Sequence, residues 1–319
     1  MSYPLVSIII PCYNIEQWIS EAIQSALDQS WPNKEIIVID DGSTDGSLEQ
    51  IKRFGARIRA ETGPNGGGSA ARNRGLVLAE GDWIQFLDGD DVMTPTCIKE
   101  KMEEPGRAQV VTCCNVEIMP RATPARDAGG PAFWFSPRYD LEYMLRLGPP
   151  QTSAPLHRKE HLRAVGGFRE DLPCAQDFDL HLRLAIGLGL GFASHGRTGV
   201  RIRPREGSIS RTAGAKMHRA MADVLLDCAE LMRQKEMLTE QYATIIAQRS
   251  ALLARKLWRL GWPREAASIA ARAKQTSARW DDILYKSRPA CLVARMIGFV
   301  AFEKLHDRWR RLRPSQVEL

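Results

Sequence analysis

Two short apolar runs, each followed by a polar turn and a helical pattern, constrain the fold of this chain most. Residues 6–10 (VSIII) and 35–39 (EIIVI) are continuous and mostly β-branched, as strands buried on both faces are. After the first run, apolar side chains recur at helical spacing over residues 15–27, and after the second a helix is predicted over residues 46–54. Strand, helix, strand, helix in this order predicts an α/β fold with a parallel sheet.

Three carboxylates follow a further apolar run, residues 83–87 (WIQFL): they are Asp88, Asp90 and Asp91. Ligands of open α/β sheets bind outside the carboxyl ends of the strands. Three carboxylates in four residues repel one another unless a cation lies among them, and Mg²⁺ or Mn²⁺ takes such ligands together with phosphates. A solvated acidic turn is the alternative, and it is favoured when the segment is taken alone.

A glycine-rich loop, residues 63–68, precedes a predicted helix over residues 69–78 that carries Arg72 and Arg74. Glycines ahead of a helix allow backbone N–H groups to approach an anion closely. No Gly-Lys-Ser/Thr follows, so the loop is not a Walker A loop. A plain surface loop is the alternative.

Length and composition limit the remaining possibilities. The 319 residues suffice for one large domain or two. We expect no transmembrane helix, because no run of 18 apolar residues occurs, and no signal peptide, because the start lacks a basic segment. Seven cysteines without framework or zinc-ligand spacing indicate reduced thiols and a cytoplasmic location, with the inner face of the membrane left open.

The C-terminal third differs in pattern and charge. After residue 212 only helices are predicted, so we expect domains over residues 1–212 and 213–319. Residues 211–319 hold 21 Lys and Arg against 11 Asp and Glu. A basic amphipathic helix is predicted over residues 289–312, suited to an anionic membrane surface; packing on the rest of the chain or on an oligomer partner is the alternative. Nucleic acid is not expected as a partner, because these cations lack a fold that reads bases.

Six segments, taken together, resemble the inverting glycosyltransferases of family 2. Over residues 5–210 they are, in the family's order, VSIIIPCYN, EIIVIDDGSTDGS, NGGGSAARNRGL, GDWIQFLDGDD, VGGFRE and QDFDLHLRLA. The resemblance implies the GT-A fold, a Rossmann-like, mostly parallel sheet flanked by helices, here with an all-helical C-terminal extension. It also implies transfer of a sugar from a nucleotide-sugar donor to a hydroxyl of a glycan or lipid-linked acceptor, in surface polysaccharide biosynthesis.

The resemblance implies donor-site residues position by position. Pro11 and Tyr13 match positions that flank the nucleotide base, and Glu16 lies nearby. Asp41 matches the acid that accepts the uracil N3–H, which favours a uridine or thymidine donor. Arg72 matches an arginine near the base and phosphates.

The implied metal and acceptor residues come later in the chain. Asp90 matches the direct ligand of a divalent metal, Mg²⁺ or Mn²⁺, and Asp88 lies nearer the ribose and the metal's waters. Asp177 matches the catalytic base, which deprotonates the acceptor hydroxyl. Arg183 either orients Asp177 or stabilises phosphate; a buried ion pair is the alternative.

Two departures from the family pattern stand out. Gln176 replaces the glutamate that usually precedes the base, which removes a charge beside it. Arg205 stands where the family often has a metal-binding histidine, and an arginine cannot ligate a metal, although it can contact phosphate.

Two other functions remain open from the sequence. A nucleotide-sugar pyrophosphorylase would share the layered sheet, but residues 11–14 lack its glycine-rich basic signature. A degenerate protein that binds a nucleotide sugar or a membrane partner without transferring sugar is the non-enzymatic alternative.

Overall fold

The computed structural model describes residues 3–103, 109–119, 133–134, 138–204, 214–282, 284 and 288–312. It divides into two compact units, Met1–Met144 with Pro149–Ser208, and Leu145–Gly148 with Ile209–Leu319. Each unit is described by itself.

The first sheet of the N-terminal unit is built around β1, which is almost completely buried. β1 pairs in parallel with β2 on one side and β4 on the other, and only the edge strand β9 runs antiparallel. In spatial order the strands are β3 (Arg59–Thr62), β2 (Lys34–Asp40), β1 (Val6–Cys12), β4 (Trp83–Phe86) and β9 (Leu156–Arg158). The chain order therefore reverses at β1, where open α/β sheets form their ligand crevice.

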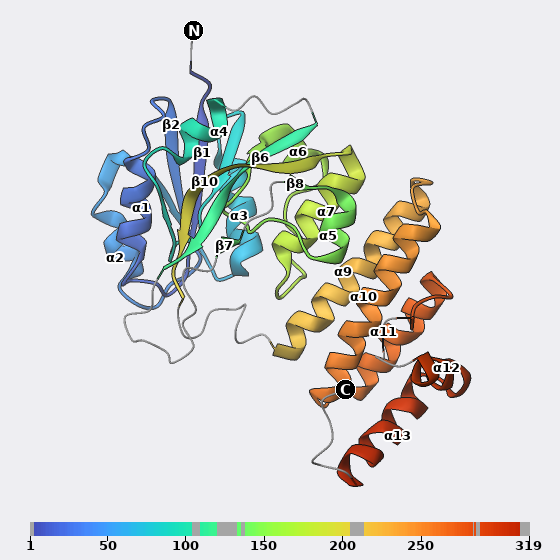
Figure 1. The fold of residues 1–319 in the computed structure, drawn as a ribbon. Coiled ribbons are helices and arrows are strands. Elements are labelled where there is room, and N and C mark those ends of the chain that lie inside the picture. The colour runs from blue at the N-terminus through green and yellow to red at the C-terminus, as the bar shows by residue number, and fades with distance from the viewer. Residues whose placement is uncertain are drawn as a thin grey trace. The chain divides into compact units, whose positions relative to one another are not determined.

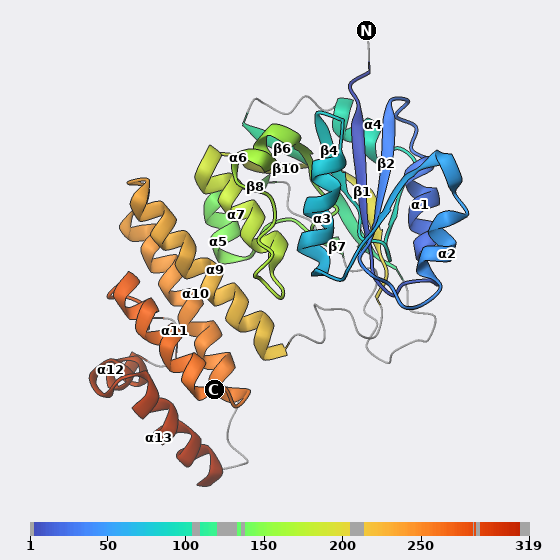
Figure 2. The ribbon, with the colours of Figure 1, turned by 180° about the vertical axis from the view of Figure 1, so that it is seen from behind.

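Helices cover both faces of this sheet. Figure 1 shows α1 (Ile19–Leu27) and α2 (Ser47–Lys52) on one side of β1 and β2, and α3 (Gly67–Leu78) on the other; Figure 2 shows α3 from the front. Gly75 lets α3 approach β1 closely, because a Cβ atom there would lie 2.3 Å from Ile9 Cγ2. The start of α3 is thereby held next to the strand ends.

A second, mixed sheet completes the unit. Its path is β5 (Val92–Met93), β10 (Gly191–Ile202), β6 (Val110–Ile118) and β7 (Phe133–Trp134), with β8 (Arg138–Tyr139) also on β10. The helices here are α4 (Cys97–Glu103), α5 (Leu141–Arg146), α6 (Lys159–Ala164) and α7 (Gln176–Leu188), and the short 3₁₀ turn η1 (Gly55–Arg57) precedes β3. β10 is one strand of twelve residues, and β7 is the only part of residues 120–137 that the structure describes.

The C-terminal unit is helical. α9 (Gly214–Gln234), α10 (Glu240–Arg259) and α11 (Pro263–Thr276) pack on one another, followed by α12 (Arg288–Ile297) and α13 (Phe299–Leu312). The single helix predicted over residues 289–312 is wrong, because Gly298 has a φ of +83° and separates α12 from α13. Within the described ranges, none of the helices is both long and apolar enough to cross a bilayer. The predicted α/β class with an all-helical C-terminal part is confirmed.

Candidate active site

The predicted site residues gather at one edge of the first sheet. Asp41 follows β2 and Asp88 follows β4, on either side of β1. Because parallel strands end at the same edge, segments 22 to 77 residues apart in sequence become neighbours there. Helix α3 starts at this edge and supplies cations to both acids.

Asp41 is almost fully buried, and its carboxylate is held from three directions. The backbone N–H of Gly66 donates to Oδ1 at 3.0 Å and that of Gly67 to Oδ2 at 2.7 Å. Arg74 on α3 forms an ion pair with Oδ1 at 2.6 Å. The glycine-rich loop is therefore anchored on Asp41, and a charged carboxylate is compensated in a buried position.

Arg72 connects the end of β4 with the start of α7. Its Nη2 lies 2.5 Å from Asp88 Oδ1, and its Nη1 donates to Gln176 Oε1 at 3.3 Å, across 104 residues of sequence. The guanidinium also lies over the Phe168 ring, 5.4 Å from its centroid. Arg72 thus fixes the first aspartate of the acidic segment relative to the helix that carries Asp177.

Asp177 lies in the first turn of α7, where its surroundings raise the pKa of its carboxyl. Burial raises the pKa of the Asp177 carboxyl, opposed by the Phe178 N–H and by the charge of Arg72; the charge of Asp88 raises it further. Ala175, just before the helix, has a φ of +59°, a strained conformation for a residue with a side chain. Strain of this kind is common at functional sites.

The remaining carboxylates of the acidic segment lie close together. Asp91 is buried and accepts the backbone N–H of Arg203 at 3.0 Å, while Arg203 Nε donates to the carbonyl of Asp90 at 3.2 Å. Burial raises the pKa of Asp91 well above its ordinary value, and the charges of Asp88 and Asp90 add to the effect. Three carboxylates thus lie in one segment with one of them buried, an arrangement that favours a nearby cation.

Other predicted residues have different surroundings. Pro11 is in β1, and Tyr13 is 48% exposed beyond its end. Glu16 Oε2 accepts the N–H of Gly46 at 2.7 Å, at the start of α2. Arg205 lies outside the described residues.

Arg183 is placed away from Asp177. Its guanidinium pairs with the buried Asp179, with Nε to Oδ2 at 2.7 Å, and donates to the carbonyls of Val165 and Gly167. This geometry is that of the buried ion pair, the alternative to a role in orienting Asp177 or in binding phosphate.

Sequence reasoning did not single out several neighbours of the site. Arg74 holds Asp41, Gln151 Nε2 lies 3.4 Å from Asp88 Oδ2, and the Ser153 hydroxyl accepts the N–H of Asp88 at 3.2 Å. The only sequence signal was Arg74 itself, two residues after Arg72; Gln151 and Ser153 lie in a segment without any pattern.

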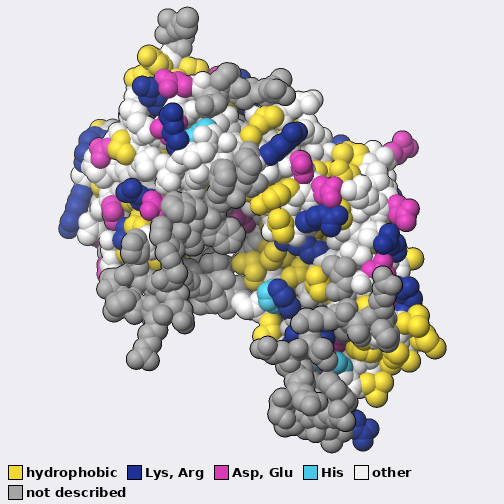
Figure 3. Space-filling model, viewed as in Figure 1, with side chains coloured by type: hydrophobic (Ala, Val, Ile, Leu, Met, Phe, Trp, Pro, Cys, Tyr) yellow, Lys and Arg dark blue, Asp and Glu magenta, His cyan; other side chains and the backbone are white. Residues whose placement is uncertain are grey.

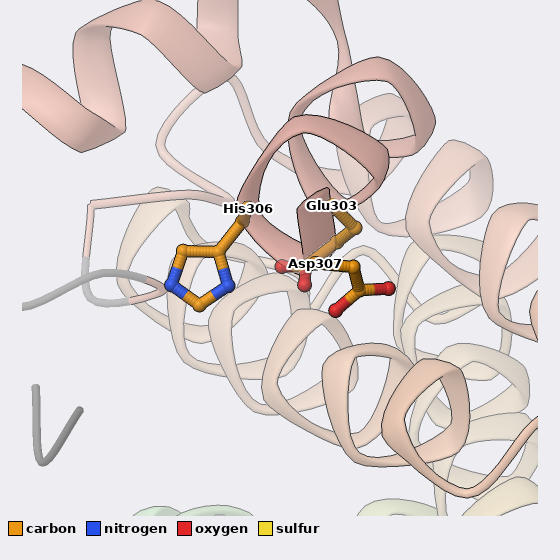
Figure 4. Close-up of side chains that lie close together, drawn as sticks. All are labelled: Glu303, His306 and Asp307. Atoms are coloured by element: carbon orange, nitrogen blue, oxygen red, sulfur yellow. The ribbon is translucent and has the colours of Figure 1, made fainter. Parts of the chain in front are cut away.

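Three side chains of metal-ligating types also lie together elsewhere in the described residues. Among the described residues, Glu303, His306 and Asp307 on α13 have ligand atoms within 4.8 Å of one another (Figure 4). Glu303 forms an ion pair with Arg255 at 3.2 Å, and Asp307 accepts Trp258 Nε1–H at 2.7 Å. These carboxylates are engaged in holding α13 to α10, and the cluster is separate from the predicted metal site at Asp88 and Asp90.

Comparison with known sequences identifies relatives of the N-terminal unit. Residues 7–157 match the model of glycosyl transferase family 2. An uncharacterized glycosyltransferase of Haemophilus influenzae is 44% identical over 106 residues, which are 32% of this chain and 42% of the relative. The chondroitin synthase of Pasteurella multocida is 32% identical over 194 residues, 57% of this chain and 19% of the synthase. The chain thus spans less than half of the length of either relative.

Solved structures share the fold. Residues 1–349 of TarS of S. aureus, determined with UDP-GlcNAc, superpose with a TM-score of 0.68 at 21% identity, covering 96% of this chain and 91% of that TarS fragment. The mannosyltransferase PcManGT of Pyrobaculum calidifontis, determined with GDP-Man and Mn²⁺, gives 0.55 at 18% identity, covering 99% and 89%. These similarities show the GT-A fold.

Proposed function

The N-terminal unit of this chain belongs to glycosyl transferase family 2, and on that basis we propose that the protein is a metal-dependent, inverting glycosyltransferase. It transfers a sugar from a nucleotide-sugar donor to a hydroxyl of a glycan or lipid-linked acceptor, in surface polysaccharide biosynthesis. The observation that carries the proposal is the pair of α3 arginines, which joins Asp41, Asp88 and the start of α7 in one site.

The donor lies along the edge formed by β1, β2 and β4 in this proposal. Asp41 accepts the N3–H of a uracil through its Oδ2 atom, which also accepts the Gly67 N–H. Pro11 and Tyr13 flank the base, and Arg72 lies toward the diphosphate. The exposed Tyr13 ring is available for stacking because nearly half of it faces solvent.

A divalent metal fits the acidic segment. The residues that would hold it are Asp90 and Asp88, since their carboxylates offer the oxygen ligands that such a metal takes, next to the buried Asp91. A bound Mg²⁺ or Mn²⁺ would neutralise charge on the donor's diphosphate. Arg72 supplies a second positive charge beside Asp88, and Arg205 remains a candidate for phosphate contact.

Asp177 acts as the base in this proposal. Burial keeps its carboxylate poorly solvated, which raises its pKa and its affinity for a proton. It removes the proton of the acceptor hydroxyl as the oxygen attacks the sugar from the face opposite the leaving diphosphate. One displacement inverts the anomeric centre.

The experiment is a screen of UDP-, dTDP- and GDP-sugars for thermal stabilisation and for slow donor hydrolysis, with Mn²⁺ and with EDTA. We expect a UDP-sugar to be hydrolysed only with metal. Asp90→Ala should abolish hydrolysis, and Asp177→Asn should abolish it while UDP still stabilises the protein. Full activity of Asp177→Asn would contradict the base assignment, and binding without turnover under every condition would favour the non-enzymatic alternative.

A further inference from the structure

Helix α12 presents its apolar side chains outward. Cys291 and Ala294 are buried, whereas Leu292, Val293, Met296 and Ile297 are 58%, 42%, 77% and 41% exposed. At 100° per residue, these four occupy the arc opposite the two buried positions, a surface here called the α12 aliphatic face. Surface helices of globular proteins normally place polar residues on that arc. Figure 3 shows hydrophobic side chains gathered on the C-terminal unit at the lower right, where α12 lies.

The next helix, α13, turns its cations outward and its acids inward. Lys304 and Arg308 are exposed beside Leu305, which is 56% exposed. Glu303 is fully buried on Arg255, and Asp307 accepts a hydrogen bond from Trp258. Figure 4 shows both acids on α13. Among the described side chains of α12 and α13, the outward surface therefore carries aliphatic groups and cations, while the carboxylates are used inside the unit.

We propose that this outward surface of α12 and α13 binds an anionic lipid bilayer. The aliphatic face enters the boundary between headgroups and acyl chains, and Lys304 and Arg308 contact lipid phosphates. The excess of 21 basic over 11 acidic residues in positions 211–319 has the sign that such a surface attracts. A symmetric contact between two copies fits less well, because it would bring the same cations together across the interface.

The test is flotation of the full-length protein with vesicles of phosphatidylcholine and phosphatidylglycerol, without donor or metal. We expect binding to the mixed vesicles that weakens with salt, and at least tenfold weaker binding to pure phosphatidylcholine. The double variant Leu292→Glu/Met296→Glu, and separately Lys304→Glu/Arg308→Glu, should each lose at least tenfold in vesicle binding.

Leu260→Glu is the matched control, because Leu260 is 51% exposed in the same unit but outside the proposed surface. It should bind vesicles like the unmodified protein. All variants should keep the unfolding temperature and the donor hydrolysis rate, since the changed residues are exposed and lie outside the proposed catalytic residues. Unchanged flotation of both double variants would overturn the proposal, as would a shift of Leu292→Glu/Met296→Glu from dimer to monomer in light scattering without vesicle binding by the parent.

Discussion

At the residue scale, two arginines on α3 each form an ion pair with an acid at the end of a strand, which compensates the negative charge of that acid. Arg72 reaches Asp88 and Gln176, and Arg74 reaches Asp41. Their positions differ by two residues, so their side chains leave the helix in different directions. The sequence placed Asp41, Asp88 and Asp177 in one site through the family resemblance, but it could not assign Arg74. An ion pair between residues 33 apart depends on how α3 sits on the sheet, which no local pattern encodes.

Replacement of Arg74 by methionine tests this compensation. Asp41 would stay buried with two backbone N–H donors but without its counter-ion, so we expect a loss of about 1–3 kcal/mol in the free energy of unfolding. UDP binding should weaken at least tenfold, because Asp41 and the anchored loop would shift. Isothermal titration with UDP and urea unfolding measure the two effects.

Arg59→Met is the control for this prediction. Arg59 lies 3.7 Å from Glu80, with the two side chains 47% and 73% exposed, and such surface pairs contribute about 0–1 kcal/mol. Equal effects of the two substitutions on UDP binding would show that Arg74 has no special role.

At the element scale, local sequence patterns predict the buried strands. Packing between elements determines where the last helices begin and end and which residues surround Asp88. The predicted strands at residues 6–10 and 35–39 lie within β1 and β2. They could be predicted because strands buried on both faces have continuous, β-branched apolar runs. The sequence predicted one helix over residues 289–312 where the structure has α12 and α13. A glycine is tolerated within a helical pattern, and only the structure shows the positive φ of Gly298. The surroundings of Asp88 depend on Gln151 and Ser153, which come from a segment with no periodicity.

Gly75→Ala should displace the whole of α3 from the sheet. The added Cβ would meet Ile9 Cγ2 at 2.3 Å, so we expect about 1–3 kcal/mol lower stability and weaker UDP binding, because both arginines move with the helix. Gly187→Ala on α7 is the matched control: its Cβ would lie 3.6 Å from Val165, an ordinary contact, and alanine favours the helix by about 0.5 kcal/mol. Thermal and urea unfolding compare the two, and equal stability of both variants would refute the close-packing argument.

At the scale of the whole molecule, acid should destabilise the N-terminal unit through two buried histidines. His157 and His181 stack with ring centroids 5.4 Å apart. Burial lowers the pKa of His181 to about 3 and the pKa of His157 well below its ordinary value. The unfolded chain binds these protons near pH 6.5, so stability is fully present above that pH and falls as the pH drops toward the folded pKa values.

The expected loss is about 2 kcal/mol from His181 between pH 6.5 and pH 5, with a further contribution from His157. Among the described residues neither ring nitrogen of His157 has a hydrogen-bond partner, so His157→Leu should keep stability at neutral pH and make the acid dependence shallower by about one proton. Urea unfolding at pH 7 and pH 5 measures this. An unchanged pH dependence in the variant would exclude His157 as a contributor.

The Arg72–Gln176 hydrogen bond also limits how this chain can be recombined with its relatives. The segment that matches the family model ends at residue 157, before Gln176, yet its Arg72 is shared with the helix beyond that point. A chimaera that takes residues 1–157 from one parent and the following residues from another would combine positions 72 and 176 from different proteins. Positions 72 and 176 should therefore be inherited together, and a crossover between them should be accompanied by the matching residue at the other position.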